Sequence, residues 1–246
     1  MEAVRRGGRR RVRPVAGRTD RPYVLLSCAM SVDGFIDDAT PERLLLSNAA
    51  DFDRVDGERA ASDAIVVGAN TIRRENPRLA VRSPARRQAR VRSGRPATPA
   101  KVTLTASGDL DPSANFFADD TLTLVYCPSS ARADLATRLG DHAEVIGVGG
   151  SLDLSAVLKD LGERGIQRLM VEGGSSVLTS FLTAGVVDEL HLAVAPFFVG
   201  DAEAPRFVGA GRYRWTPTET MRLVDTTAIG DVALLRYRLS DREAPA

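Results

Sequence analysis

Two adjacent glycines stand where the chain could bind a phosphate. They follow an apolar run that ends at Glu172, and Ser175 and Ser176 come next, at the start of a helical pattern. Because Gly173 and Gly174 have no Cβ, the amides of such a turn and the N-terminus of the following helix can approach an anion closely. The same residues also fit an ordinary strand-to-helix turn in which a serine caps the helix. The sequence leaves both interpretations open.

A second turn of this kind follows the apolar run 64–68. Gly68 ends that run, and Thr71 stands three residues later, near the expected start of a helix. Open α/β sheets gather their ligands beyond the carboxyl ends of the strands, so the Thr71 hydroxyl could contact a cofactor. Alternatively, Thr71 is a plain helix cap. Neither turn contains the Gly-x-Gly-x-x-Gly pattern of a Rossmann fold.

Asp33 and three arginines are further candidates. Asp33 follows the first apolar run, where it could face a substrate or belong to an Asp-Gly turn. Arg59 stands near the end of a helical pattern, and Arg78 and Arg82 follow an Asn-Pro pair. Paired guanidinium bonds from such residues can bind a phosphate. In a chain so rich in arginine, each of them also fits an ordinary surface position.

The composition argues against several classes of protein. His142 and His191 have no second histidine or Cys-x-x-Cys pair nearby, so a zinc deaminase site cannot be built and no metal is expected. Cys28 and Cys127 each lie in an apolar run and are predicted to be buried, reduced thiols. No apolar run is long enough to cross a membrane, and arginines stand where a signal peptide would be apolar. A cytoplasmic protein without a membrane partner is therefore predicted.

The net charge of +1 conceals an uneven distribution. Residues 1–21 hold eight arginines against two acidic residues, which gives +6 and leaves −5 for the rest of the chain. Residues 1–20 are predicted to be a disordered Arg-rich tail, and residues 21–241 a single folded domain. Nucleic-acid contact through this tail is the less favoured alternative, in which the chain would be a non-catalytic nucleotide-binding module.

Short β-branched runs alternate with helical patterns from Tyr23 onwards, which predicts an α/β fold. The predicted strands span residues 23–30, 64–68, 101–105, 121–127, 144–148, 168–172 and 187–195, and a closing hairpin joins 221–227 to 232–239. Helices are predicted from Ser47 or Asn48 to about Ala61 and over 131–139, 155–164 and 175–184. Residues 78–101 carry eight basic residues, several prolines and no acid, so most of that segment is predicted to be an irregular surface loop.

The order of these motifs resembles that of the pyrimidine reductases of riboflavin biosynthesis and their dihydrofolate reductase-like relatives. The resemblance covers about residues 21–209 and is carried by RPY (21–23), AMSVDG (29–34), SDAIVVGANT (62–71), NPRLAVR (76–82), VEGG (171–174), FL (181–182), VDEL (187–190) and AP (195–196). It implies a dihydrofolate reductase-like three-layer α/β fold, with a mixed, mostly parallel sheet, helices on both faces and a C-terminal antiparallel hairpin. It also implies a homodimer.

The resemblance further implies that NADPH transfers a hydride to the ribose C1 of a phosphoribosylamino-pyrimidine, such as 5-amino-6-(5-phosphoribosylamino)uracil. The implied cofactor-binding residues are Ala29, Gly68, Thr71, Glu75, Ser107, Gly173, Gly174, Ser175, Ser176, Val177 and Leu178, with Ser107 or Ala106 near the adenosine 2′-phosphate. The implied substrate-binding residues are Ser47, Arg59, Leu79, Arg82 and Glu172. Asp33 and Glu172 are the candidate proton donors, and a water molecule is the alternative.

Three positions depart from the family pattern. Ser27 stands where many riboflavin-pathway enzymes have lysine, and Arg43 and Leu45 lie in a stretch that often reads Ser-x-Trp. The first change removes a mobile cation from the pocket, and the loss of tryptophan removes a stacking surface for an aromatic ring. A dihydropterin- or dihydrofolate-type reductase of the same fold is therefore kept as an alternative.

Overall fold

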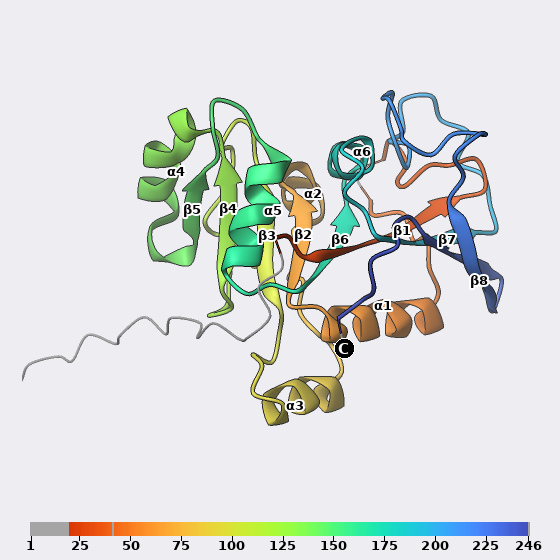
Figure 1. Cartoon of the computed structure of the whole chain (residues 1–246), viewed down its shortest axis with the longest axis horizontal. Helices are drawn as coiled ribbons and strands as arrows, with labels where there is room; N and C mark the ends of the chain where they lie inside the picture. Colours follow the sequence, from red (N-terminus) through yellow and green to blue (C-terminus); the bar gives the residue numbers. More distant parts are fainter. Residues whose placement is uncertain (1–19, 41, 246) are drawn as a thin grey trace, which may run out of the picture.

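The computed structural model describes residues 20–40 and 42–245, in which nine strands form one mixed sheet (Figure 1). The strands are β1 (Tyr23–Ser31), β2 (Ala64–Gly68), β3 (Ala100–Leu104), β4 (Thr123–Cys127), β5 (Glu144–Gly147), β6 (Arg168–Gly173), β7 (Glu189–Ala195), β8 (Arg222–Ile229) and β9 (Val232–Arg238). Their order is β5-β4-β3-β2-β6-β1-β7-β9-β8. Neighbours from β5 to β7 are parallel, whereas β9 is antiparallel to both β7 and β8. The predicted hairpin is confirmed, and the Arg-rich tail lies outside the described residues apart from Asp20.

Helices cover both faces of this sheet (Figure 1). They are α1 (Ala49–Ala61), α2 (Ala69–Glu75), α3 (Pro84–Arg92), α4 (Arg132–Leu139), α5 (Leu154–Glu163) and α6 (Ser175–Thr183), with short 3-10 turns at Asn115–Phe117, Ser129–Ala131 and Gly140–His142. Leu158 of α5 and Phe181 of α6 pack in one core cluster, and Ile72 of α2 and Leu135 of α4 pack in the other. None of the helices in the described part of the chain is long and apolar enough to cross a membrane.

Side chains alternate between the two faces along each buried strand, as strand geometry requires. Cys28 lies in the cluster beneath α5 and α6, and Cys127 lies in the cluster beneath α2 and α4. Both thiols are buried and free, as predicted, and burial raises the pKa of Cys28 to about 12. A strand buried on both faces reads as a continuous apolar run, which is why β2 could be placed from the sequence.

The prediction of an irregular loop through most of residues 78–101 holds for residues 78–83 and 93–99 but is wrong between them, because Pro84–Arg92 form helix α3. Ser83 caps this helix by accepting the amide of Arg86 at 3.4 Å. Pro84 stands in the first turn, where the amide that proline lacks would have no helical partner. Arg90 is buried and donates hydrogen bonds to carbonyl oxygens at the C-terminal end of α1. A proline that suggested a loop therefore marks the start of a helix.

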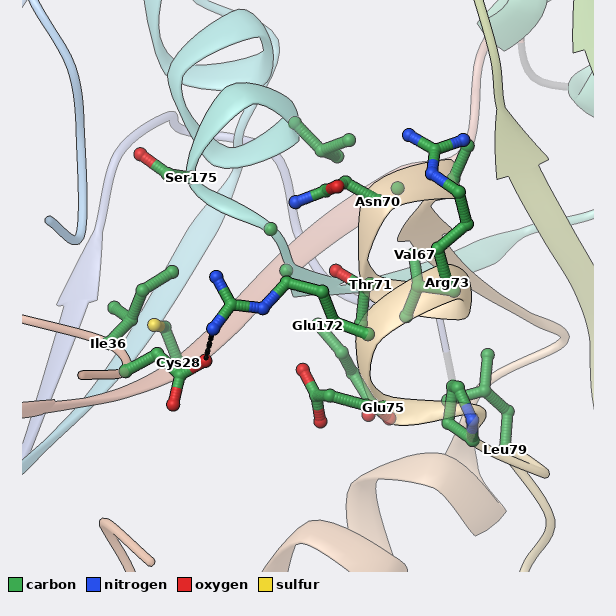
Figure 2. A pocket seen from close by; sticks show the side chains of 18 of the residues that line it. Cys28, Ile36, Val67, Asn70, Thr71, Arg73, Glu75, Leu79, Glu172 and Ser175 are labelled. Atoms are coloured by element: carbon green, nitrogen blue, oxygen red, sulfur yellow. Dashed lines mark ion pairs between the residues drawn. The ribbon is translucent and has the colours of Figure 1, made fainter. Parts of the chain in front are cut away.

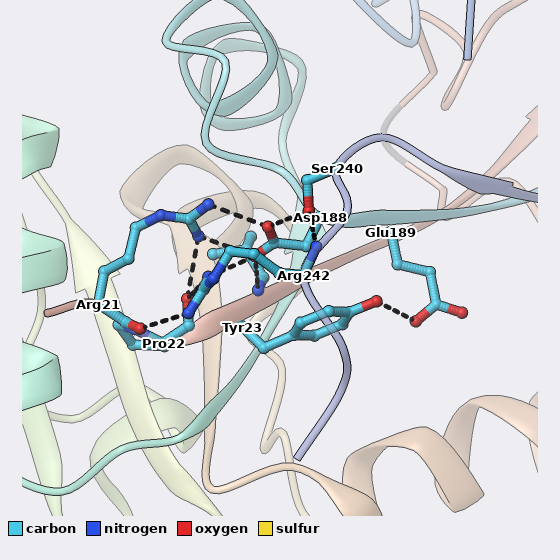
Figure 3. A network of polar contacts seen from close by, with 8 residues as sticks. Arg21, Pro22, Tyr23, Asp188, Glu189, Ser240 and Arg242 are labelled. Carbon is cyan, nitrogen blue, oxygen red and sulfur yellow. Dashed lines mark hydrogen bonds and ion pairs between the residues drawn. The ribbon is translucent and has the colours of Figure 1, made fainter. Parts of the chain in front are cut away.

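The chain segments before β1 and after β9 are tied together at Asp188, which is fully buried just before β7 (Figure 3). Arg21 donates bonds of 2.8 and 2.9 Å to its two oxygens, and Arg242 donates one of 2.9 Å. The Ser240 hydroxyl and the Val24 amide supply two more, at 2.6 and 2.9 Å. Burial opposes ionisation of Asp188, but these bonds outweigh it, so its pKa is lowered. Five donors thus fix the entry to β1 and the exit from β9 at one point.

Candidate active site

A β-bulge at the end of β6 directs a carboxylate toward the carboxyl edge of the sheet. Val66 of β2 pairs with Val171 of β6, but Val67 pairs with Gly173, so Glu172 is an extra residue in the ladder. Bulges of this kind change the direction of a side chain at the end of a strand. Glu172 accordingly lines the cleft that opens at this edge.

The two turns singled out in the sequence are in contact, because β2 and β6 are neighbours. A Cβ added to Gly174 would lie 2.9 Å from Thr71 Oγ1, and one added to Gly68 would lie 3.0 Å from Val177 Cγ2. Gly173 and Gly174 have φ values of +143° and +71°, which side chains disfavour. Because the cap of α6 is a glycine, no side chain accepts the first amides of this helix. These amides form a cradle that suits a phosphate.

A cleft of about 890 Å³ lies at the ends of β1, β2, β3 and β6. Figure 2 shows Thr71 and Glu75, both on α2, facing the strand end that carries Glu172. Every predicted site residue except Asp33 and Leu178 lines this cleft: Ala29, Ser47, Arg59, Gly68, Thr71, Glu75, Leu79, Arg82, Ser107, Glu172, Gly173, Gly174, Ser175, Ser176 and Val177. Residues far apart in the sequence are therefore brought together around one space.

Asp33 and Leu178 take other positions. Leu178 is fully buried in the core beneath α6. The Asp33 carboxylate accepts the amides of Val199 at 3.1 Å and Gly200 at 2.8 Å, and the Ser31 hydroxyl at 2.5 Å. Desolvation raises the pKa of Asp33, but these bonds outweigh it and the net shift is downward. Asp33 therefore braces the loop after β7, which does not suit a proton donor.

Arginines gather at the end of the cleft next to α1. Arg59 donates two bonds of 2.6 Å to the two oxygens of Glu172, and a third of 3.3 Å to the Ala80 carbonyl. Desolvation lowers the pKa of Arg59, but its pairing with Glu172 raises that pKa by more. The Arg82 guanidinium lies 5.6 Å from the centre of the Phe52 ring and has no ion pair within the described residues. This end of the cleft therefore offers charge to an anionic group.

Glu75 is the second carboxylate of the cleft, at the end of α2. Its Oε2 lies 3.4 Å from Nε of Arg43. Burial raises the pKa of Glu75, Arg43 opposes this shift, and repulsion from Asp37 and Glu172 adds to it. Because the net shift is upward, the carboxyl holds a proton to higher pH than a free glutamate does.

The three positions that depart from the family pattern have different surroundings. Ser27 is buried on β1 and lines a side pocket of about 130 Å³, to which Arg54, Arg59 and Arg82 also contribute. Leu45 is 64% exposed and lies outside the cleft lining. Arg43 forms an ion pair with Glu75. Arginines therefore line the side pocket together with the carboxylates of Asp51, Asp56 and Glu172, although position 27 carries no cation.

Sequence reasoning missed several residues at the cleft. Asn70 and Arg73 line it from α2, but neither stands three or four residues from Thr71 or Glu75, so helical spacing would not have identified them. Asp56 bonds to the backbone amides of residues 82 and 83. No sequence pattern reveals such a contact, because backbone amides are the same at every residue.

Comparison with known families and relatives identifies proteins similar to this chain. The RibD C-terminal domain family matches residues 22–235. The 2,5-diamino-6-ribosylamino-4(3H)-pyrimidinone 5′-phosphate reductase of Archaeoglobus fulgidus is 35% identical over 186 residues, which are 75% of this chain and 85% of that protein.

Two solved structures share the fold. A pyrimidine reductase-like protein from Corynebacterium diphtheriae superposes with a TM-score of 0.73 at 26% identity, covering 88% of this chain and 91% of that one. A Thermotoga maritima diaminohydroxyphosphoribosylaminopyrimidine deaminase/5-amino-6-(5-phosphoribosylamino)uracil reductase gives 0.71 at 23% identity. The match covers 89% of this chain but only 56% of that longer protein, and it speaks for the fold alone. The predicted fold and family resemblance are confirmed.

Proposed function

The chain belongs to the RibD C-terminal domain family and is a reductase, and we propose that it reduces a phosphorylated ribosylamino-pyrimidine of riboflavin biosynthesis with NADPH. The observation that carries this proposal is the meeting of three features in one cleft. The Gly173-Gly174 turn, the Thr71 hydroxyl and the arginines around Glu172 all line it. One end suits the phosphates of a dinucleotide, and the other suits a phosphorylated sugar.

The residues present fit a dinucleotide. The glycine turn leaves the space that a Cβ would fill beside Thr71, and the N-terminus of α6 faces it with amides that no side chain caps. We assign the pyrophosphate to this cradle and the adenosine to the end of β3, where Ser107 lines the cleft. When bound, NADPH supplies a hydride from its nicotinamide ring. The protein's part is to hold the two reacting carbons in contact and to exclude water.

The substrate phosphate is assigned to the arginine end of the cleft. Arg82 has no competing ion pair in the described part of the chain, and Arg59 can share its guanidinium between Glu172 and a phosphate. Leu79 is buried in the same wall and gives an apolar surface for the pyrimidine ring. The Archaeoglobus fulgidus relative is named for a 2,5-diamino-pyrimidinone substrate, and we propose the same compound for this chain.

In the ring-opened sugar, a C=N bond joins C1 of the ribose to the nitrogen that links it to the pyrimidine. When a hydride reduces this bond at C1, the linking nitrogen must receive a proton. Asp33 braces a loop, and both oxygens of Glu172 accept bonds from Arg59. Glu75 lines the cleft, and burial raises its pKa. We therefore assign proton delivery to Glu75 and the orientation of Arg59 to Glu172.

A homodimer is also proposed. Strand β8 stands at the edge of the sheet and exposes Leu223 and Val224, by 53% and 55%. An unpaired edge strand with apolar side chains suits pairing with a second copy. Light scattering on the purified chain measures the mass directly, and a monomeric mass would contradict this pairing.

The activity is tested by mixing purified protein and NADPH with 2,5-diamino-6-ribosylamino-4(3H)-pyrimidinone 5′-phosphate and following NADPH absorbance. Parallel reactions contain 5-amino-6-(5-phosphoribosylamino)uracil, dihydrofolate or a dihydropterin, and NADH replaces NADPH in a further series. Turnover of the diamino-pyrimidinone with NADPH supports the proposal. Turnover of dihydrofolate alone assigns the alternative activity. If NADPH neither binds nor is oxidised with any of these compounds, the proposal fails.

A further inference from the structure

Asp56 is a buried carboxylate next to the arginine end of the cleft. It lies on α1, three residues before Arg59, and is only 4% exposed. One of its oxygens accepts the backbone amide of Arg82. The other accepts the amide of Ser83 at 3.1 Å and Nη1 of Arg86 at 2.9 Å. Both oxygens are therefore occupied by the start of α3 and the segment that precedes it.

That segment, residues 76–83, forms one wall of the cleft without helix or strand structure of its own. It contains Leu79 at a φ of +51°, a backbone conformation that a leucine rarely adopts unless its surroundings impose it. Backbone amides outside regular structure need acceptors when they are buried. Asp56 supplies two of these bonds, and Arg59 on the same helix binds the Ala80 carbonyl at 3.3 Å.

We propose that Asp56 is a positioning residue for the substrate half of the cleft. By holding the amides of residues 82 and 83 against α1, its carboxylate sets where Arg82 and Leu79 stand relative to Arg59. The identity of the substrate rests on the proposed function, but the positioning itself does not. A carboxylate is suited to this task because it can accept two amides at once, whereas a neutral amide side chain offers one acceptor oxygen.

The competing explanation is that Asp56 matters only because it pairs with Arg86. Asp53 separates the two possibilities, since it accepts bonds of 2.6 and 2.8 Å from the same guanidinium. Asp53 is 70% exposed and outside the cleft lining, and within the described residues its carboxylate bonds to Arg86 alone. Asp53→Asn is therefore the matched control for Asp56→Asn.

Steady-state kinetics of the two variants tests the proposal. Asp56→Asn keeps the shape but turns an NH2 group toward a backbone amide, so residues 82 and 83 shift. Because residues 82 and 83 belong to the wall that positions the substrate, their shift is expected to lower kcat/KM for the pyrimidine phosphate. The expected loss is about 10- to 100-fold, mainly through a higher KM. The affinity for NADPH should stay within about twofold, and Asp53→Asn should stay within about twofold in every constant. Equal effects of the two variants on KM would overturn the proposal.

Hydrogen exchange gives a second readout that does not depend on turnover. In the unaltered protein the amides of Arg82 and Ser83 should exchange slowly, and free exchange of both would refute the proposed contact even if Asp56→Asn failed to fold. In a folded Asp56→Asn variant these two amides should exchange faster than in Asp53→Asn, and equal rates count against the proposal. If the wild-type protein turns over no pyrimidine, the proposed function fails while these exchange rates still decide the role of Asp56.

Discussion

Replacing Gly174 by alanine tests the proposed cofactor cradle most directly. At a φ of +71° and ψ of 131°, a residue with a side chain is strained by about 1–3 kcal/mol. The new methyl group would lie 2.9 Å from Thr71 Oγ1, so the Thr71 side chain or one of the two turns must move, at a further cost of about 1–3 kcal/mol. Each kcal/mol lowers Tm by about 2–4 °C in a chain of this size.

The same displacement should weaken NADPH binding. If the shifted turn loses one hydrogen bond to a charged phosphate, about 1.5–3 kcal/mol of binding free energy is lost. That corresponds to at least about a tenfold rise in Kd. Gly94→Ala is the control, because Gly94 also has a positive φ, of +78°, but nothing lies within 4 Å of its added Cβ. It should lower Tm through strain and leave the NADPH affinity unchanged.

A double-mutant cycle with Thr71→Ala isolates the contact itself. Removing the Thr71 hydroxyl takes away the atom that the new methyl meets, so the double variant should lose less stability than the two single losses added together. The coupling should exceed about 0.5 kcal/mol, as is usual for residues in contact. Thermal unfolding gives the stabilities, and nucleotide fluorescence titration gives Kd. A Gly174→Ala variant that binds NADPH as tightly as wild type would refute the cradle.

Two further substitutions test carboxylates. Asp188→Asn should lower the unfolding free energy by about 3 kcal/mol, the low end for a broken buried ion pair because Arg21 and Arg242 are partly exposed. Since the pKa of Asp188 is lowered on folding, this loss of stability should be complete at neutral pH. In thermal scans it should begin to shrink as pH falls below about 4 and should disappear once pH is below the lowered pKa of the folded state; a pH-independent difference would contradict it. Glu75→Gln should remove the fall in kcat/KM that wild type shows as pH rises through the raised pKa of Glu75, and an unchanged pH profile would exclude Glu75 as the proton donor.

Most of the sheet could be predicted because its central strands are buried on both faces. β2 was placed at both ends, since a short apolar run between polar residues has few other interpretations. Helix α6 was predicted to begin at Ser175, and it does, because the glycine pair stops the strand and frees the helix amides. Helix α3 was missed because arginine-rich segments have no apolar stripe, and its stability depends on contacts with α1.

Predicting the candidate site was possible for the turns and less so for the acids. Glycine pairs, and a threonine after a buried strand, restrict the backbone locally, so their positions could be inferred from neighbouring residues. The role of Asp33 depends on the amides of Val199 and Gly200, more than 160 residues away in the chain. When the partners of a side chain are backbone groups, the residue types at the partner positions do not indicate the contact.

The acids Asp33, Glu172 and Glu75 show why residue type alone does not assign a proton donor. Asp33 accepts two amides and a hydroxyl, which favour its charged form, whereas both oxygens of Glu172 accept bonds from one guanidinium. Arg43, at 3.4 Å from Glu75, lowers the pKa of that carboxyl. Burial and two neighbouring carboxylates raise it by more, so the net shift is upward. In the proposed mechanism, the number of donors that each carboxylate receives assigns bracing to Asp33, the orientation of Arg59 to Glu172 and proton transfer to Glu75. Adding a donor beside Glu75 should therefore move it toward the behaviour of Asp33, and its acid role should weaken accordingly.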